Sequence, residues 1–142
     1  MKSRMALIIG AALLVLAVSA YAHHPFSAEY DWKQPVTLTG TVSKVTWSNP
    51  HAFLYIDGKD QNGEMKHWTL EMGSPTALSR AGWSQNTLKM GDQVTVDAWM
   101  SKTKNDHANV KSVKMADGRE LSGASSIGNM PSSQEKNKPT TN

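Results

Sequence analysis

The sequence predicts an all-β domain with one short helix, arranged as a five-stranded β-barrel of the OB type. Apolar and polar residues alternate with a period of two in five segments, which is typical of strands with one buried face. A single helix signal separates the third segment from the fourth. In an OB barrel, a coiled five-stranded sheet closes on itself with its helix at this position. A small β sandwich is the alternative, and the position of the helix favours the barrel.

The first strand is predicted over residues 36–47. Val36, Leu38 and Val42 alternate with threonine and serine residues, which places the apolar side chains on one face. Gly40 lies in the middle of this strand and predicts a bulge or a sharp coil of the strand, because a glycine within a strand often marks one of these. The strand is long enough to pair with both halves of a barrel.

Two shorter strands are predicted over residues 51–57 and 64–72, joined by a polar turn. Alternation places one set of their side chains inward: Ala52, Leu54, Ile56, Trp68, Leu70 and Met72. The other set faces outward: His51, Phe53, Tyr55, Met65, His67, Thr69 and Glu71. In an OB barrel the outward face of strands two and three is the usual ligand face.

The period changes after the third strand. Ser74 is a favourable N-cap, Pro75 suits the first helical position, and Gly82 ends the helix, which is expected over residues 75–81. This short helix is the only one that the sequence predicts in the exported domain.

The chain then returns to strands. A fourth strand is predicted over residues 94–99 and a fifth over 108–115, after which Asp117-Gly118 makes a turn. From residue 122 to residue 142, almost no large apolar side chain occurs. This last segment is therefore predicted to be a disordered polar tail.

The first 22 residues have the three parts of a secretory signal peptide. Lys2 and Arg4 are positively charged, residues 5–18 form an apolar run of 14, and Ala20-Tyr21-Ala22 is a cleavage signal. The run is shorter than the roughly 20 residues of a membrane span. Cleavage after Ala22 is expected, and an uncleaved anchor is the alternative. The sequence thus predicts a periplasmic or secreted protein with an N-terminal arm over residues 23–35 and a barrel domain over 36–121.

The charge balance argues against a nucleic-acid partner. The whole chain has 15 Lys and Arg against 12 Asp and Glu, and loss of the leader removes two positive charges, which leaves 13 against 12. There is no Cys, so neither a disulfide nor a lipid anchor on cysteine is expected. The motifs G-x-S-x-G and H-E-x-x-H are absent, as is a phosphate-binding glycine loop. A binding protein is therefore expected rather than an enzyme, and copper redox chemistry is the alternative.

Several motifs, taken in order, resemble those of a known family. They are His23-His24-Pro25-Phe26, Trp47-Ser48-Asn49-Pro50-His51-Ala52, Glu71-Met72-Gly73-Ser74-Pro75 and Gly91-Asp92-Gln93-Val94-Thr95-Val96. Over roughly residues 23–121, the chain resembles domain of unknown function family 6152, an uncharacterised family of secreted bacterial proteins. The resemblance implies a small exported β domain and supplies no activity.

The N-terminus that cleavage creates is the leading candidate for a metal site. If His23 becomes the first residue, its amine and imidazole can chelate Cu(II), which prefers nitrogen ligands in a tetragonal arrangement. His24 adds a second imidazole, and cleavage after Ala20 would instead leave a His at position three, which also suits Cu(II). His51 and His107 lie at the two loops that flank the ligand face of an OB barrel, so we expect them as further ligands. The competing interpretation is that these histidines have no metal role.

The alternative to a copper protein is a metal-free module for an envelope ligand or a protein partner. Its binding surface would be the outward side chains Phe53, Tyr55, His67 and Trp99. Aromatic side chains are enriched at binding surfaces, which favours this interpretation. The competing interpretation is that the arm or the helix covers these aromatic residues.

Overall fold

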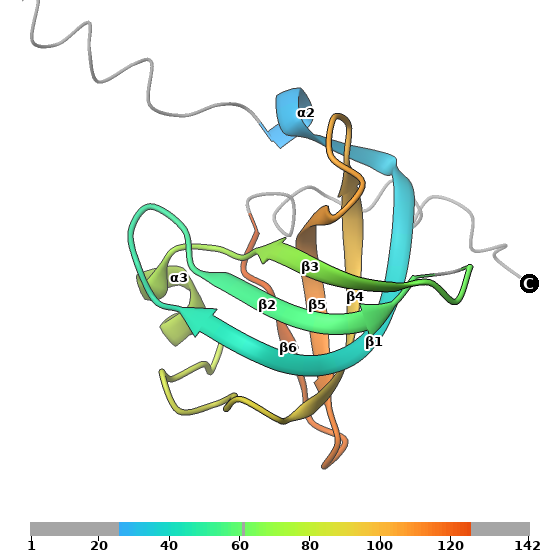
Figure 1. Cartoon of the computed structure of the whole chain (residues 1–142). Coiled ribbons are helices and arrows are strands. Elements are labelled where there is room, and N and C mark those ends of the chain that lie inside the picture. The colour runs from blue at the N-terminus through green and yellow to red at the C-terminus, as the bar shows by residue number, and fades with distance from the viewer. Residues whose placement is uncertain (1–25, 61, 126–142) are drawn as a thin grey trace, which may run out of the picture.

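The computed structural model describes residues 26–60 and 62–125, and within them it contains six strands and two short helices (Figure 1). The helices are α2 (Phe26–Glu29) and α3 (Pro75–Arg80). The strands are β1 (Tyr30–Thr46), β2 (Phe53–Lys59), β3 (Met65–Glu71), β4 (Gln93–Ser101), β5 (His107–Met115) and β6 (Glu120–Ser122). No helix in these residues is long and apolar enough to cross a membrane.

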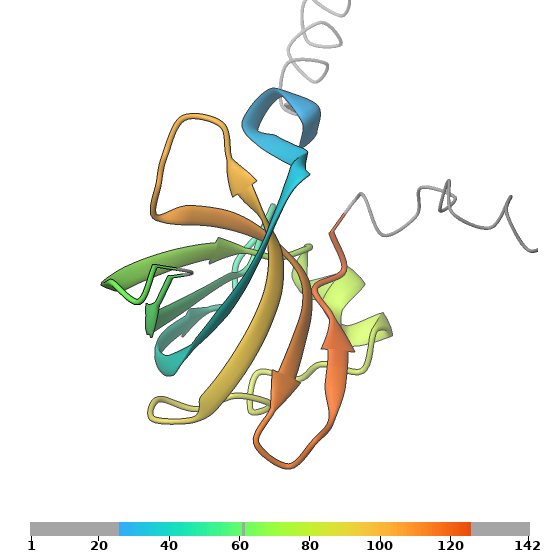
Figure 2. The ribbon, with the colours of Figure 1, turned by 90° about the vertical axis from the view of Figure 1, so that its right-hand side faces the viewer.

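The strands form one sheet that closes into a ring (Figures 1 and 2). Their order is β3-β2-β1-β4-β5-β6, with antiparallel pairing between neighbours. The ring closes where β3 pairs with β5 in parallel, over residues 69–71 and 107–109. As expected, the long first strand serves both halves: residues 39–46 pair with β2, and residues 35–41 pair with β4.

The hydrophobic core fills the inside of the ring. The alternation predicted for β2 and β3 is confirmed, because the side chains expected inward are those that the structure buries: Ala52, Leu54, Ile56, Trp68, Leu70 and Met72. β1, β4 and β5 contribute further buried valine, leucine, alanine and methionine side chains. Such burial is the main source of stability for a domain without disulfides.

Of the two alternatives predicted at Gly40, the bulge is wrong. The register between β1 and β2 shifts between Val42 and Lys44, so the irregularity lies three residues later. Gly40 has a different role, because it pairs directly with Gly58 at a point where the two strands approach closely. A β-carbon on Gly40 would lie 2.6 Å from the carbonyl oxygen of Asp57, so no larger side chain fits without movement of the backbone.

The predicted helix and its boundaries are confirmed. The hydroxyl of Ser74 accepts a hydrogen bond from the amide of Ala77, and Pro75 opens the helix. Gly82 follows the helix with φ of +93°, a conformation that glycine adopts without strain. α3 lies between β3 and β4 in the chain, as the sequence predicts.

The structure differs from the sequence-based boundaries at both ends. β1 begins at Tyr30 rather than at residue 36, so most of the expected arm belongs to the sheet or to α2. A sixth strand, β6, follows the five that were expected; with only three residues it is too short to show a hydrophobic period. Residues 123–125 were assigned to the tail, yet the amide of Gly123 donates to the carbonyl of Lys111 and Ser125 is buried. Backbone pairing orders this segment without large apolar side chains. The predicted leader, His23, His24 and residues 126–142 lie outside the described residues.

Candidate functional site

A row of four side chains crosses the outer surface of the sheet near one end of the ring. The register pairs Phe53 of β2 with Glu71 of β3, and Glu71 with Asn109 of β5. Asn109 in turn pairs with Trp99 of β4. The residues that adjoin this row along the four strands are core residues: Leu54, Leu70, Ala108 and Ala98. Because side chains alternate along a strand, the row faces away from the core.

α2 and the start of β1 cover this row. The Tyr30 hydroxyl donates to Glu71 Oε2 at 2.8 Å, and the ring of Phe26 lies 5.2 Å from that of Tyr30 and 5.8 Å from that of Trp99. The backbone amide of Lys102 donates to the carbonyl of Glu29 at 2.8 Å, which attaches α2 to the loop between β4 and β5. Both views show α2 and this loop at the same end of the molecule (Figures 1 and 2).

A cavity of about 370 Å³ opens beneath this cover, and we call it the Glu71 pocket. It combines two aromatic side chains of β2 with a carboxylate of β3, three hydroxyls, and charged groups of α2 and the β4–β5 loop. Its lining residues are Glu29, Tyr30, Phe53, Tyr55, Thr69, Glu71, Ser101, Thr103, Lys104 and His107. An aromatic wall with a few converging polar groups is the usual composition of a small-molecule site.

Glu71 is the centre of the hydrogen bonds in this pocket. Its side chain is 15 % exposed, its Oε2 accepts from Tyr30, and its Oε1 lies 3.4 Å from Asn109 Nδ2. His51 Nδ1 lies 3.7 Å from the same Oε1. Burial raises the pKa of the Tyr30 hydroxyl far above its ordinary value, and its hydrogen bond to Glu71 adds to this shift. Tyr30 is therefore a permanent neutral donor that orients the carboxylate.

His107, at the start of β5, lines the pocket, and one of its ring nitrogens is hydrogen-bonded to a neighbouring carboxylate. Its Nδ1 lies 2.6 Å from Asp106 Oδ1, and this hydrogen bond lowers the pKa of the Asp106 carboxyl. Among the residues that the structure describes, no hydrogen bond occupies Nε2 of His107. A carboxylate on one ring nitrogen fixes the orientation of an imidazole and leaves the other nitrogen for a ligand or a metal ion.

The structure brings together only part of the predicted site. Phe53, Tyr55 and His107 line one pocket, and His51 stands beside Glu71 at its edge. His67 is 93 % exposed and pairs with Asp57, outside the pocket. Trp99 lies under the ring of Phe26, so the competing interpretation, that the arm covers it, applies.

The predicted copper ligands lie only partly within the described residues. His23 and His24 are outside them, and His51 and His107 are inside. In the part of the chain that the structure describes, no group of three or more His, Cys, Asp or Glu side chains is arranged to hold a metal ion. His51 donates from Nδ1 toward the carbonyl oxygen of Met72, at 3.2 Å, because a carbonyl oxygen can only accept.

Sequence analysis missed three residues of the site: Tyr30, Glu71 and Asn109. Alternation along its strand places Glu71 on the outer face of the sheet. This pattern does not indicate which side chains of other strands contact Glu71. Asn109 lies between two apolar residues, Ala108 and Val110, and this polar interruption is the one signal that could have indicated a special position. Tyr30 precedes the predicted first strand, so its phase could not be assigned.

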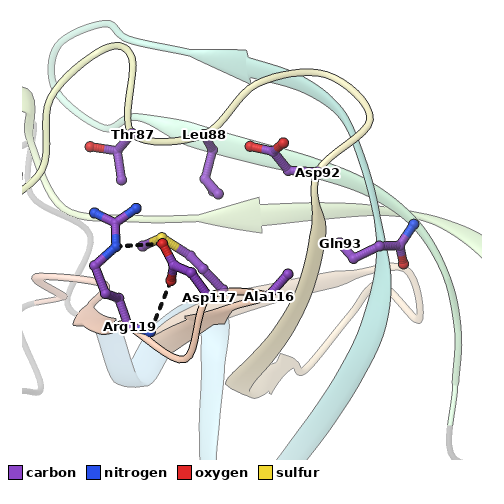
Figure 3. Close-up of a pocket in the computed structure, with 8 residues that line it drawn as sticks. Thr87, Leu88, Asp92, Gln93, Ala116, Asp117 and Arg119 are labelled. Atoms are coloured by element: carbon purple, nitrogen blue, oxygen red, sulfur yellow. Dashed lines mark hydrogen bonds and ion pairs between the residues drawn. The ribbon is translucent and has the colours of Figure 1, made fainter.

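Two other cavities have less suitable linings. One, of about 190 Å³, lies at the turn between β5 and β6; there Arg119 Nε binds Asp117 at 2.7 Å (Figure 3). The other, of about 430 Å³, lies beside Lys66, which Asp60 neutralises at 2.7 Å. In both, these charges are already paired within the chain. The Glu71 pocket differs because, within the described ranges, no lysine or arginine pairs with the Glu71 carboxylate, and His51 Nδ1 lies 3.7 Å from it.

A model of a family of unknown function, DUF6152, matches residues 11–110 of the chain. The chain belongs to the DUF6152 family. The stretch that the DUF6152 model matches contains every lining residue of the Glu71 pocket and the whole row from Phe53 to Asn109, whereas β6 lies beyond it. No curated protein and no solved structure matches the chain.

Proposed function

We propose that this DUF6152 protein is an exported binding protein that holds a small organic ligand in the Glu71 pocket. The observation that carries the proposal is the lining of the pocket, in which the rings of Phe53 and Tyr55 lie beside the Glu71 carboxylate under the cover of α2. Ligand sites typically combine such apolar walls with a few fixed polar groups. Export follows from the predicted signal peptide, and the absence of catalytic motifs favours binding over catalysis.

We further propose that the ring of strands is an OB-type barrel. Its support is the connectivity, with three strands, one helix and two strands, and with β1 paired to both β2 and β4. The short β6 extends the sheet beyond those five strands. In OB barrels, ligands meet the face of strands two and three and the loops that flank it. The Glu71 pocket uses β2, β3 and the β4–β5 loop, which agrees with this placement.

The proposal can be tested by native mass spectrometry of the protein exported through its own leader. We expect a retained small-molecule mass on the wild type and its loss from a variant with both Phe53→Ala and Tyr55→Ala. The matched control is Met65→Ala, which removes an exposed side chain of β3 outside the pocket. An adduct that survives in the double variant, with circular dichroism of both variants unchanged, would contradict the proposal.

A second candidate function is copper binding through the predicted N-terminal histidines. Two observations favour it: His107 has its Nδ1 held by Asp106, and His24 is only two residues from Phe26, which packs over the row.

Copper binding has its own test. Native mass spectrometry with one equivalent of Cu(II) and a competing chelator should show one retained copper on protein that begins at His23, and none on the His23→Ala variant. His67→Ala is the control, since this exposed histidine lies outside the pocket. Equal copper retention by the wild type and His23→Ala would exclude an N-terminal chelate.

A further inference from the structure

Glu71 is a largely enclosed carboxylate, and among the residues that the structure describes no lysine or arginine lies at hydrogen-bond distance from it. Its donors within that distance are the neutral Tyr30 hydroxyl at 2.8 Å and the neutral Asn109 amide at 3.4 Å. His51 Nδ1, at 3.7 Å, is too far for a hydrogen bond and is charged only when protonated. Carboxylates removed from water are normally neutralised by a nearby cation. In this part of the chain the neutralising group is missing.

Asn109 strengthens the same conclusion from a separate atom. Its side chain is 3 % exposed, and its Oδ1 has no hydrogen-bond partner in the described residues. Because Nδ2 of the same amide turns toward Glu71, the carbonyl end adds a second unsatisfied acceptor to the same region. The negative charge of Glu71 and the unpaired carbonyl oxygen of Asn109 together create a negative potential beside the pocket.

The aromatic wall suits a positive charge as well. The rings of Phe53 and Tyr55 lie 6.4 Å apart, and both line the pocket. Lys44 Nζ lies 5.6 Å from the centre of the Tyr55 ring but does not line the pocket, so Phe53 is the ring that we assign to a ligand. The faces of aromatic rings attract ammonium groups through their quadrupole.

We propose that the Glu71 pocket binds ligands through a protonated amine, whose ammonium donates to Glu71 while its apolar part lies against Phe53. This inference rests on the proposed function, since it names the class of ligand for the same site. Lys104 and His107 of the lining, and Lys44 beside Tyr55, would favour an anion instead, so the test includes an anionic probe.

The test uses three probes of similar size: 2-phenylethylamine, 2-phenylethanol and 3-phenylpropanoate. Their affinities are measured by NMR chemical-shift titration of the ¹⁵N-labelled protein near neutral pH and low salt. We expect the amine to bind about tenfold more tightly than the alcohol, because one charge-assisted hydrogen bond changes affinity by about ten- to a hundredfold. Equal affinities for amine and alcohol, or tightest binding of the anion, would overturn the inference.

Glu71→Gln is the decisive variant, since it keeps the shape and an oxygen that accepts from Tyr30 but removes the charge. In Glu71→Gln, the ratio of the affinities for the amine and the alcohol should fall to about one. Glu120→Gln makes the same change of charge at an exposed position of β6 and should leave this ratio as in the wild type. If Glu71→Gln does not fold, the wild type supplies the test: added salt should weaken binding of the amine and not of the alcohol. An amine affinity that is independent of salt would overturn the inference.

The outcomes separate this inference from the proposed function. If the alcohol and the amine bind equally, and both are lost in the double Phe53/Tyr55 variant, the pocket binds ligands without selecting a cation. If none of the three probes shifts the resonances of residues that line the pocket, both proposals fail.

Discussion

The hydrogen bond from Tyr30 to Glu71 should contribute measurably to stability. Tyr30→Phe removes only the hydroxyl, while the ring, 6 % exposed in the wild type, keeps its place beside Phe26. A hydrogen bond to a charged group contributes about 1.5–3 kcal/mol. We expect the free energy of unfolding near pH 7 to fall by about 2 kcal/mol, which for a domain of 60–100 residues lowers Tm by roughly 8–16 °C.

The same hydroxyl gives this prediction a signature in pH. The pKa of Tyr30 is raised in the folded protein, so its contribution is complete below the unfolded pKa of about 10 and is lost as the pH rises above that value. Between pH 7 and pH 11, ionisation of Tyr30 in the unfolded state should lower the free energy of unfolding of the wild type by about 1.4 kcal/mol. Tyr30→Phe lacks this hydroxyl and should not show this loss. The difference between the two proteins should therefore shrink from about 2 to about 0.6 kcal/mol, since all other groups titrate in both.

Urea unfolding followed by tryptophan fluorescence at pH 7 and pH 11 measures both quantities. Tyr55→Phe is the matched control, because it removes a tyrosine hydroxyl that makes no hydrogen bond among the described residues, and its cost should stay below about 0.5 kcal/mol. The reasoning is refuted if the two variants cost the same at pH 7. It is also refuted if the cost of Tyr30→Phe does not diminish at pH 11.

Three further predictions concern the fold and use urea unfolding. Gly40→Ala should destabilise the protein by about 1–3 kcal/mol or more, because its β-carbon would lie 2.6 Å from a carbonyl of β2; wild-type stability would show that the strands can separate. Gly123→Ala should also destabilise the protein, since its β-carbon would overlap the Val110 carbonyl. An unchanged free energy of unfolding would indicate that residues 123–125 belong to the disordered tail and do not pack against β5. Leu54→Ala, at a fully buried position, should cost about 2–5 kcal/mol, and a cost under about 1 kcal/mol would contradict its place in the core.

The parts of the fold that depend on residues close together in the sequence could be predicted. The period of two separated inward from outward side chains in β2 and β3, and Ser74, Pro75 and Gly82 defined the helix. Two errors have the same physical origin. The role of Gly40 depends on Gly58 across the sheet, and β6 depends on pairing with β5, so neither appears in the residues nearby.

The site was predictable to a smaller extent for a related reason. Phe53, Tyr55 and His107 were expected near one another, because OB-type connectivity brings their elements to one rim. Which residue of β3 faces Asn109 depends on register, and a single sequence does not contain the register of a parallel pair 38 positions apart. Tyr30 could not be assigned, since α2 and the loop after β4 hold it in place.

The two sides of the sheet bury side chains for different physical reasons. Inside the ring, the buried side chains are apolar except for the indole N–H of Trp68, and their burial stabilises the fold in the ordinary way. Outside, at the row beneath α2, the enclosed groups are a carboxylate and an amide whose carbonyl lacks a donor. Apolar residues of similar size at such positions are often neutral or stabilising, so stability alone does not account for Glu71 and Asn109. An enclosed carboxylate with no lysine or arginine paired to it in the described residues, set in an aromatic pocket, is the arrangement expected where a ligand supplies the positive charge.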